Sequence, residues 1–383
     1  MAQGTPPKAI VIGAGVGGLA AGIALRLAGC EVEVYERAGE LHEVGAGISL
    51  WANAIGALER LGLGDAVRSA SVPYEVAGIR TPDGRFLATV SSELLEREFG
   101  TPIIVVHRAD LQAALLGRLG PERLHPGRVC TGFEQTGDAV TAIFDDGRRA
   151  RADLLIGADG LHSVIRAQIH GRQPPRYAGC TAWRAVVRFS DRQVRASESW
   201  GRGSVFGQVP MSGGRVYWYA TRNEPAGGRS AHPRSELFEM FRGWHDPIGS
   251  LIEAADEPAI LRNDIYDRDP ARRWGTGRVT LVGDAAHPMT PFMGQGGCQA
   301  LEDAVVLGHC LERAGDVPAS LRAYERIRIR RANTFVTRSR MAGRIAQLQH
   351  PVAVKLRNAV FARLSPHLQT AQLAKLIRGA GPT

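Results

Sequence analysis

The sequence predicts an α/β protein in which a Rossmann-like nucleotide-binding domain is interrupted by an α+β domain built on a mostly antiparallel sheet. A glycine-rich turn between an apolar strand and a helical run lies near the N-terminus, and two more buried strands ending in Gly-Asp or Gly-Ala-Asp follow later. From Tyr177 to Arg222 the chain changes to strand-like segments rich in Trp, Tyr, Val and Phe. We therefore expect a nucleotide-binding domain over 1–173 and 274–330, a substrate-binding domain over 174–273, and a C-terminal helical segment over 331–383.

Composition indicates a globular protein and excludes several classes. The 383 residues suffice for two cores, and 44% hydrophobic content is ordinary. Five dispersed cysteines without CxxC spacing argue against a disulfide framework or a zinc site, and no other metal-ligand cluster stands out. The dispersed cysteines and the lack of an export signal at the start indicate a reducing, cytoplasmic location. We expect a monomer or homodimer. The net charge of +9 lacks an aromatic-spaced basic stripe, so nucleic-acid binding is disfavoured.

The first motif is Gly13-x-Gly15-x-x-Gly18, which lies between an apolar strand and a helical run, with Glu36 at the end of a second strand. Gly13 permits a tight turn, Gly15 lets backbone approach a pyrophosphate, and Gly18 lets helix and strand pack closely. Glu36 suits the adenosine ribose of FAD or NAD better than that of NADP. Arg37 can contact a phosphate or lie solvated in a loop.

The second motif, Leu154 to Gly160, is a buried strand that ends in Gly-Ala-Asp-Gly, followed by Ser163 and Arg166 at helical spacing. Asp159 lies where a strand passes into a helix, so it can hold a ribose or ribityl hydroxyl. The alternative is purely structural: Asp159 pairs with Arg166 at the helix start and needs no ligand.

The third motif begins with the apolar strand from Val279 and continues through Gly283 and Asp284 to Gly294, Gly296 and Gly297, before a helix expected from Ala300 to about Glu312. An acid at a strand end and free N–H groups at a helix start suit a polyol and a ring that becomes anionic. A flavin has both parts. An ordinary strand–loop–helix joint is the alternative.

Two further segments lie where backbone can approach a ligand. Val44 to Leu50 is rich in small residues, including Gly47. Arg108 precedes a helix and can reach a phosphate or a ring edge. The alternative is an arginine of the helix-capping region that contacts no ligand. Val76–Val90 and Val129–Ala150 are expected to be hairpins.

Taken together, the three motifs resemble those of the group A (single-component) flavoprotein monooxygenases of the p-hydroxybenzoate hydroxylase fold. The order and separation match over most of the chain, and the motifs are most similar to the branch with salicylate hydroxylase, urate hydroxylase and zeaxanthin epoxidase. The resemblance implies a GR2-type FAD-binding domain, tightly bound FAD, and NADPH or NADH bound transiently.

The resemblance also assigns roles to residues. It implies Glu36 on the adenosine ribose, Asp284 on the ribityl chain, and Asp159 in a motif that contacts both FAD and NAD(P)H. The remaining flavin contacts would come from the family arginine, Arg108, and from the third motif: Pro291, Gly294, Gly296, Gly297 and Cys298. Cys298 is expected to be a small buried residue rather than a nucleophile.

The implied reaction is reduction of FAD by NAD(P)H, formation of a flavin C4a-hydroperoxide with O2, and oxygen transfer to a small aromatic or unsaturated substrate. Because the cofactor performs the difficult step, no side chain is expected to be catalytic, although Pro291 and His287 lie near the flavin motif. His287 can equally be a loop histidine bonded to backbone. A reductase or oxidase of the same fold, or a non-catalytic FAD-binding protein, remains possible.

Substrate recognition is expected from the inserted sheet, where Tyr217 and Tyr219 share one strand face and Trp218 points to the other. Either of two arginines can bind a carboxylate or phenolate. The candidates are Arg184, Arg202, Tyr217, Tyr219 and Met293, each with a surface or core role as its alternative.

The C-terminus, Ser320 to Gly379, is expected to form successive helices interrupted at Pro351 and Pro366. Such basic, amphipathic helices can contact a membrane or a partner. Covering a core face is the more common role, so membrane association is not expected.

Overall fold

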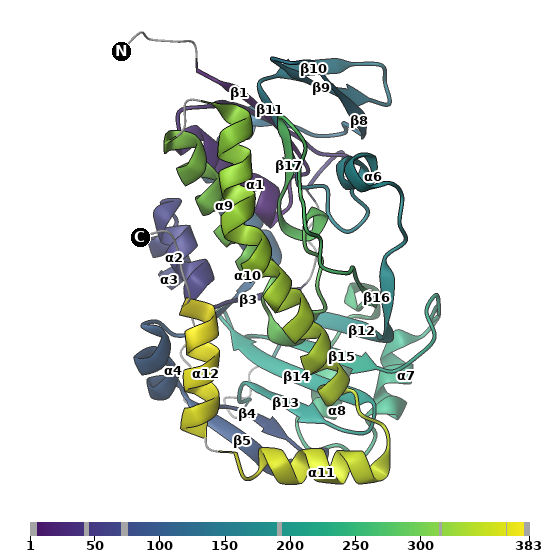
Figure 1. Cartoon of the computed structure of the whole chain (residues 1–383). Helices are drawn as coiled ribbons and strands as arrows, with labels where there is room; N and C mark the ends of the chain where they lie inside the picture. Colours follow the sequence, from purple (N-terminus) through teal and green to yellow (C-terminus); the bar gives the residue numbers. More distant parts are fainter. Residues whose placement is uncertain are drawn as a thin grey trace.

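The computed structural model describes residues 6–41, 46–69, 76–189, 194–313, 316–364 and 366–378. It has two main sheets, one at each end of the molecule, joined by one long helix (Figure 1). The fold is the α/β arrangement that the sequence predicts.

The first sheet is parallel throughout, with strand order β17-β11-β1-β2-β7. Strand β17 follows the strands of the second sheet in the sequence and pairs with β11 of the first sheet. The chain therefore returns to the first sheet, as expected. Helix α1 packs against α9 and α5 beside it. The bounds are β1 Lys8–Ile12, β2 Glu31–Tyr35, β7 Leu124–His125, β11 Leu154–Gly157, β17 Val279–Leu281, α1 Val16–Leu27, α5 Arg108–Leu119 and α9 Gly296–Arg313.

The second sheet has seven strands in the order β16-β12-β15-β14-β13-β4-β5, all antiparallel except the β13–β4 pair. Trp183 and Trp218 point to the face that α7 and α8 cover, where they form a buried core with Phe206 and Leu237. The bounds are β4 Val76–Arg80, β5 Phe86–Ser91, β12 Arg176–Arg188, β13 Ser197–Trp200, β14 Ser204–Met211, β15 Arg215–Arg222, β16 Leu261–Asp267, α7 Pro233–Met240 and α8 Ile248–Glu253.

The expected hairpin at 76–90 is confirmed as β4–β5. Strand β4 also pairs with β13, so the hairpin extends the second sheet. The exact division of the chain into domains stays a prediction.

The segment 129–150 contains more than the expected hairpin. An additional turn, in which Thr136 N donates to Ala139 O, separates β8 from β9, and the two strands form a three-stranded sheet with β10. The bounds are β8 Cys130–Gln135, β9 Val140–Phe144 and β10 Arg149–Ala152.

Smaller elements connect the two sheets. Strands β3 (Gly47–Leu50) and β6 (Ile104–His107) pair antiparallel and pack toward the second sheet through Ala46, Val105 and Tyr217. The remaining elements are α2 Ala52–Arg60, α3 Gly64–Ser69, α4 Ser92–Phe99, α6 Val164–His170 and the 3-10 helices Pro121–Arg123, Glu257–Ala259, Gly283–Ala285 (η3) and Pro291–Met293 (η4).

Three helices end the described chain: α10 (Val317–Ala346), α11 (Pro351–Phe361) and α12 (Pro366–Arg378). The predicted interruptions are confirmed, since Pro351 and Pro366 are each the first residue of a helix. Helix α10 links both sheets: Tyr324 donates to Leu281 O at 3.0 Å, and Gln347, the residue that follows the helix, donates from Nε2 to Thr221 Oγ1 at 2.5 Å. Among the described residues, no helix is long and apolar enough to cross a membrane.

Candidate active site

The first glycine motif forms a tight turn before α1. Gly13 has a φ of 106°, and a Cβ there would lie 2.5 Å from Ala158 O. A Cβ on Gly18 would lie 1.9 Å from Gly13 O, whereas a Cβ on Gly15 would meet nothing within 4 Å. Since α1 has neither a side-chain cap nor an acid in its first turn, its free N–H groups face this open space. The turn therefore provides the geometry of a phosphate site.

Glu36 lies beside this turn and is held by backbone. Its Oε2 accepts from Ala14 N at 2.7 Å and its Oε1 from Ala38 N at 3.0 Å. Gln112, which sequence reasoning missed, donates to Ala14 O at 2.7 Å from helix α5. One glutamine in an amphipathic helix carries no signal, so only the structure reveals it. Arg37 is exposed.

Asp159 caps the start of α6 but not through an arginine. Its Oδ2 accepts from Val164 N at 2.7 Å, while its buried Oδ1 has no hydrogen-bond partner in the described structure. Burial raises the pKa of this carboxyl. The alternative Asp159–Arg166 pair does not form: Arg166 donates to Ala285 O at 3.0 Å and Ala286 O at 2.8 Å, and burial lowers its pKa to about 10. Arg166 thus joins the second motif to the third.

In the third motif, Asp284 has an exposed side chain that nevertheless lies deep among protein atoms. This desolvation raises the pKa of its carboxyl, opposed by the charges of His287 and Arg108. Arg108, the exposed first residue of α5, thus lies close enough for its charge to act on Asp284. An acid lining open space inside a protein is what a polyol site requires.

Helix α9 begins at Gly296, four residues earlier than expected, and has no acid in its first turn. Gly294 before it adopts a left-handed conformation with a φ of 59°, and a Cβ on Gly297 would lie 2.6 Å from Ile48 Cδ1. Cys298 is fully buried, and burial raises the pKa of its thiol to about 12. It is a small core residue, not a nucleophile.

His287 belongs to a buried network that the sequence did not reveal. Its Nε2 lies 2.6 Å from Asp303 Oδ2, which also accepts from Gly283 N at 2.9 Å. Arg328 Nε donates to the other Asp303 oxygen at 2.8 Å. His287 therefore has a carboxylate partner rather than the backbone partner of the alternative interpretation, and α9 and α10 hold the loop that contains Asp284.

The predicted substrate residues separate into two groups. Arg184 lies opposite Tyr219 in the β12–β15 register, and the rings of Tyr217 and Tyr219 are 5.6 Å apart. Tyr217 also lies over Gly47, where a Cβ would be 2.6 Å from the Tyr217 ring. As predicted, these tyrosines share the face opposite Trp218, and this face turns toward β3.

Arg202 and Met293 are placed by other contacts. Arg202 is exposed beyond β13 and donates from Nε to Gln349 O at 3.3 Å. Met293 packs against the cluster of Leu95 and Phe335, which Val90 of β5 in the second sheet also contacts. Pro291 is exposed at the start of η4. The substrate roles of Arg202 and Met293 stay predictions.

Glu198 is a second residue that the sequence did not single out. Tyr219 OH donates to Glu198 Oε1, and Trp200 Nε1 donates to Glu198 Oε2 at 2.8 Å. Tyr219 reaches Glu198 across Gly207, where a Cβ would lie 2.1 Å from Tyr219 Cζ. Arg184, Tyr219, Gly207 and Glu198 thus form one row across four strands.

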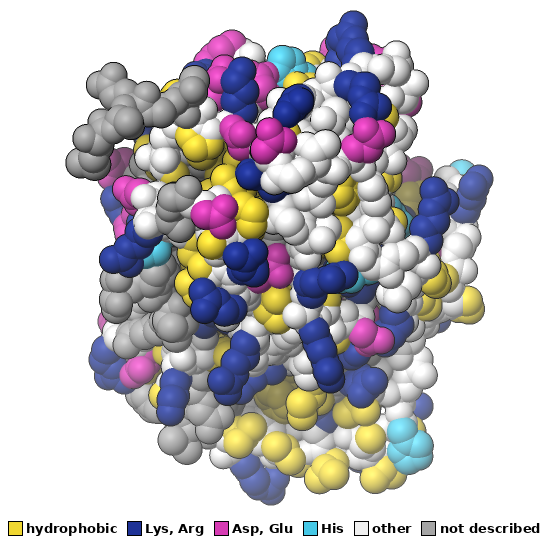
Figure 2. Space-filling view, turned by 45° about the horizontal axis from the view of Figure 1, so that its top comes forward, with side chains coloured by type: hydrophobic (Ala, Val, Ile, Leu, Met, Phe, Trp, Pro, Cys, Tyr) yellow, Lys and Arg dark blue, Asp and Glu magenta, His cyan; other side chains and the backbone are white. Residues whose placement is uncertain are grey.

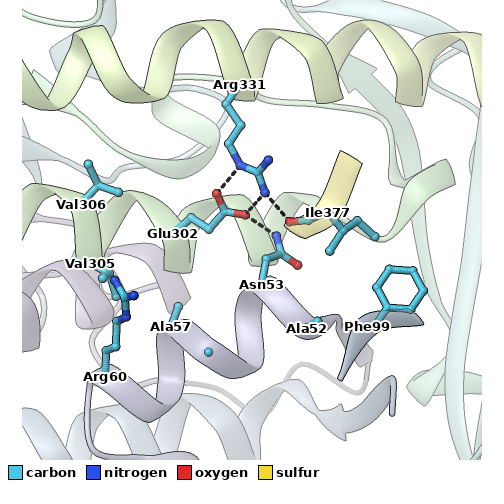
Figure 3. A pocket seen from close by; sticks show the side chains of 11 residues that line it. Ala52, Asn53, Ala57, Arg60, Phe99, Glu302, Val305, Val306, Arg331 and Ile377 are labelled. Carbon is cyan, nitrogen blue, oxygen red and sulfur yellow. Dashed lines mark hydrogen bonds and ion pairs between the residues drawn. The ribbon is translucent and has the colours of Figure 1, made fainter. Parts of the chain in front are cut away.

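A cavity of about 250 Å³ lies between α2, α9, α10 and α12 (Figure 3). Arg331 and Asn53 both donate to Glu302 on its wall. The cavity contains none of the residues predicted from the sequence for cofactor or substrate, so it does not coincide with the candidate active site. Its lining residues are Ala52, Asn53, Gly56, Ala57, Arg60, Phe99, Glu302, Val305, Val306, Arg331 and Ile377.

Comparison with known proteins agrees with this geometry. A family model described as FAD binding domain matches residues 7–339. The aurachin C monooxygenase/isomerase of Stigmatella aurantiaca is 44% identical over 360 residues, which are 93% of this chain and 94% of the relative. The FAD-dependent urate hydroxylase of Klebsiella pneumoniae is 38% identical over 341 residues, 87% of this chain and 88% of the relative. The crystal structure of Klebsiella pneumoniae HpxO complexed with FAD and uric acid superposes with a TM-score of 0.92 at 34% identity, covering 97% of both chains.

The chain belongs to this FAD-binding family of flavoprotein monooxygenases. It is an FAD-dependent monooxygenase that consumes NAD(P)H, as is typical of the family. The observed residues fit FAD: open space at Gly15 before a helix without acids, the unpaired Asp159 Oδ1, and the exposed Asp284 carboxylate.

Proposed function

We propose that the enzyme inserts one oxygen atom into a small, electron-rich aromatic or heteroaromatic substrate bound against the Arg184–Tyr219 face of the second sheet. One observation carries the proposal: half-buried Arg184 has no hydrogen-bond or ion-pair partner among the described residues. An arginine so placed lacks a hydrogen-bond acceptor, which a substrate oxyanion or carbonyl oxygen would supply. The relatives above are named for aurachin C and urate.

We propose the following arrangement of FAD along the three motifs. The pyrophosphate would lie at Gly13, Gly15 and Gly18, the adenosine ribose at Glu36, and the ribityl chain at Asp284. The flavin ring edge would face the first-turn N–H groups of α9, which would stabilise negative charge on it. When bound, FAD supplies the oxygen-transfer chemistry, while the chain orients the ring and excludes water. The remaining assignments are Arg37, Gly47, Arg108, Asp159, Pro291, Gly294, Gly296, Gly297 and Cys298.

The Glu198–Tyr219 hydrogen bond supports a finer substrate class. Because the Tyr219 hydrogen is directed to Glu198, its oxygen has only lone pairs left for a ligand. Burial raises the pKa of Tyr219 well above its usual value, and Glu198 adds to the effect, so the phenol stays protonated at neutral pH. We propose that the substrate offers an N–H or O–H donor to Tyr219 and an acceptor oxygen to Arg184.

The cysteines bear on the location of the enzyme. Five free, buried cysteines suit a reducing compartment, so we propose a cytoplasmic enzyme, monomeric or homodimeric, with O2 as co-substrate.

The test is the visible spectrum of the purified protein, followed by NADH and NADPH oxidation with hydroxylated N-heterocycles, phenols and simple alkenes. We expect bound FAD, oxidation stimulated by compounds that carry both a donor and an acceptor, and a product heavier by one oxygen. Stimulation by compounds without a donor, or oxidation without an oxygenated product, would contradict the proposed substrate class.

A further inference from the structure

Helix α11 presents an apolar row to solvent. Val352, Leu356, Val360 and Leu364 recur every four residues and are 66%, 65%, 45% and 43% exposed. This spacing places them on one face of the helix and its last turn. The opposite face is the one that covers protein: Phe361 packs edge-on against Trp200 at 5.0 Å. The expected role of the C-terminal helices, to cover a face of the core, therefore accounts for only one side of α11.

The C-terminal segment that carries this row is basic and contains no acid. The chain contains no Asp or Glu from Arg326 to Arg378. Exposed Lys355 and Arg363 lie on α11 and its last turn, beside the apolar row, and Arg344 is exposed at the end of α10. Figure 2 shows hydrophobic side chains gathered at the lower end of the molecule, with basic side chains around them.

We propose that α11 and the end of α10 form a docking surface for an anionic lipid bilayer. The apolar row would enter the boundary between headgroups and acyl chains, while Lys355, Arg363 and Arg344 would meet lipid phosphates. Such a helix lies in the interface rather than across the membrane, in keeping with its length of 11 residues.

Charge makes a second copy of this chain a poor occupant of the same surface. In a two-fold dimer the patch would face itself, and Lys355 and Arg363 would meet the same basic residues of a segment that contains no acid. An anionic lipid surface supplies the missing negative charge.

The docking surface is also close to the candidate substrate face. The Arg357 guanidinium of α11 lies 5.3 Å from the Trp200 ring, and Trp200 donates to Glu198 at 2.8 Å. Trp200 therefore contacts both α11 and Glu198, the partner of Tyr219. The link between the docking surface and the substrate face rests on the proposed function and suits a substrate that partitions into lipid. Binding of the protein to lipid is itself independent of the reaction.

The experiment is sedimentation of the full-length, FAD-loaded enzyme with vesicles of equal parts phosphatidylglycerol and phosphatidylcholine, or of phosphatidylcholine alone. We expect binding to the anionic vesicles that weakens as salt rises. Leu356→Glu with Val360→Glu should reduce the partition coefficient by more than about tenfold. Lys355→Glu with Arg363→Glu should reduce it by at least about tenfold, since each basic side chain contributes about fivefold near an anionic surface.

Leu27→Glu is the matched control, because Leu27 is 53% exposed on α1 at another part of the surface. It should leave vesicle binding unchanged, and all variants should keep the flavin spectrum of the parent. The proposal is overturned if the anionic vesicles do not bind, if Leu27→Glu weakens binding as much as the α11 variants, or if the protein forms a dimer that Leu356→Glu dissociates. Since none of these readouts needs substrate, a wrong substrate class would leave them unchanged.

Discussion

The His287 ring and the Asp303 carboxylate form a completely buried hydrogen bond, with Nε2 and Oδ2 2.6 Å apart. Burial by itself would raise the pKa of Asp303, but the charges of His287 and Arg328 hold it below its usual value. The ionised carboxylate therefore fixes both ends of the Gly283–His287 loop, with Asp284 between them. A buried charge network thus sets the position of the acid proposed to bind the ribityl chain.

Replacing Asp303 with Asn should weaken FAD binding at least about tenfold and lower the melting temperature. The substitution leaves Arg328 buried with less counter-charge, a change that costs about 3–5 kcal/mol when a buried partner is lost. FAD fluorescence titration and thermal unfolding measure the two effects. Asp267→Asn is the control, since Asp267 is equally buried and pairs with Arg176 and Arg340. It should lower stability without changing FAD affinity, and unchanged FAD affinity in Asp303→Asn would refute the positioning role.

The same network predicts how stability depends on pH. The pKa values of Asp303 and Glu302 are both lowered: burial opposes this, but His287 and Arg328 dominate for Asp303, and Arg328 and Arg331 for Glu302. A carboxyl with a lowered folded-state pKa stabilises the fold above its unfolded pKa of about 4 and loses this contribution as pH falls. Urea unfolding at neutral pH and at about pH 3, below the unfolded pKa, should show a smaller acid-induced loss in Asp303→Asn than in the parent. An equal loss would mean that Asp303 does not contribute.

The local motifs were predictable from the sequence, but their long-range partners were not. Gly13, Gly18 and Gly294 occupy positions where spacing alone indicates close approach or a left-handed turn, and the structure has both. Glu198 and Asp303 depend on contacts between segments far apart in the chain, and an isolated acid in a strand or helix normally indicates a solvated surface. The partner of a strand was likewise not predictable, because nothing in the local sequence of the hairpin at 76–90 identifies β13 as its neighbour.

Arg184→Ala should raise the substrate KM about 10- to 100-fold, because a hydrogen bond to a charged group contributes about 1.5–3 kcal/mol. Flavin content and melting temperature should stay near the parent values, since Arg184 has no partner within the described structure. Arg202→Ala, on an exposed residue bonded to Gln349 O, should leave KM unchanged. Steady-state kinetics with the best substrate from the panel compare the two, and equal KM values in both variants would remove Arg184 as an anchor.

Gly207→Ala should raise the substrate KM and reduce stability by about 1–3 kcal/mol, the usual cost of overpacking. The new methyl group would lie 2.1 Å from Tyr219 Cζ and push the ring away from Glu198. Gly117→Ala in α5 is the control, since its Cβ would meet nothing within 4 Å, and it should be neutral or stabilising. If KM in Gly207→Ala equals that of the parent, the Tyr219 position does not matter for binding.

Tyr219 should distinguish two ligands that differ only by one hydrogen-bond donor. The probes are 4-quinolone, with a ring N–H and a carbonyl oxygen, and its N-methyl derivative, compared by titration of the flavin absorbance. If the Tyr219 hydroxyl donates its hydrogen to Glu198, only the N–H compound can donate to the remaining lone pair of the Tyr219 oxygen. The parent enzyme should therefore bind the N–H compound at least about fivefold more tightly than the N-methyl compound. Tyr219→Phe should remove this preference. Glu198→Leu, which frees the hydroxyl to rotate and donate, should shift selectivity toward compounds that offer only acceptors. Equal binding of the two quinolones by the parent, or a preference that survives in Tyr219→Phe, would show that the substrate donor is not recognised here.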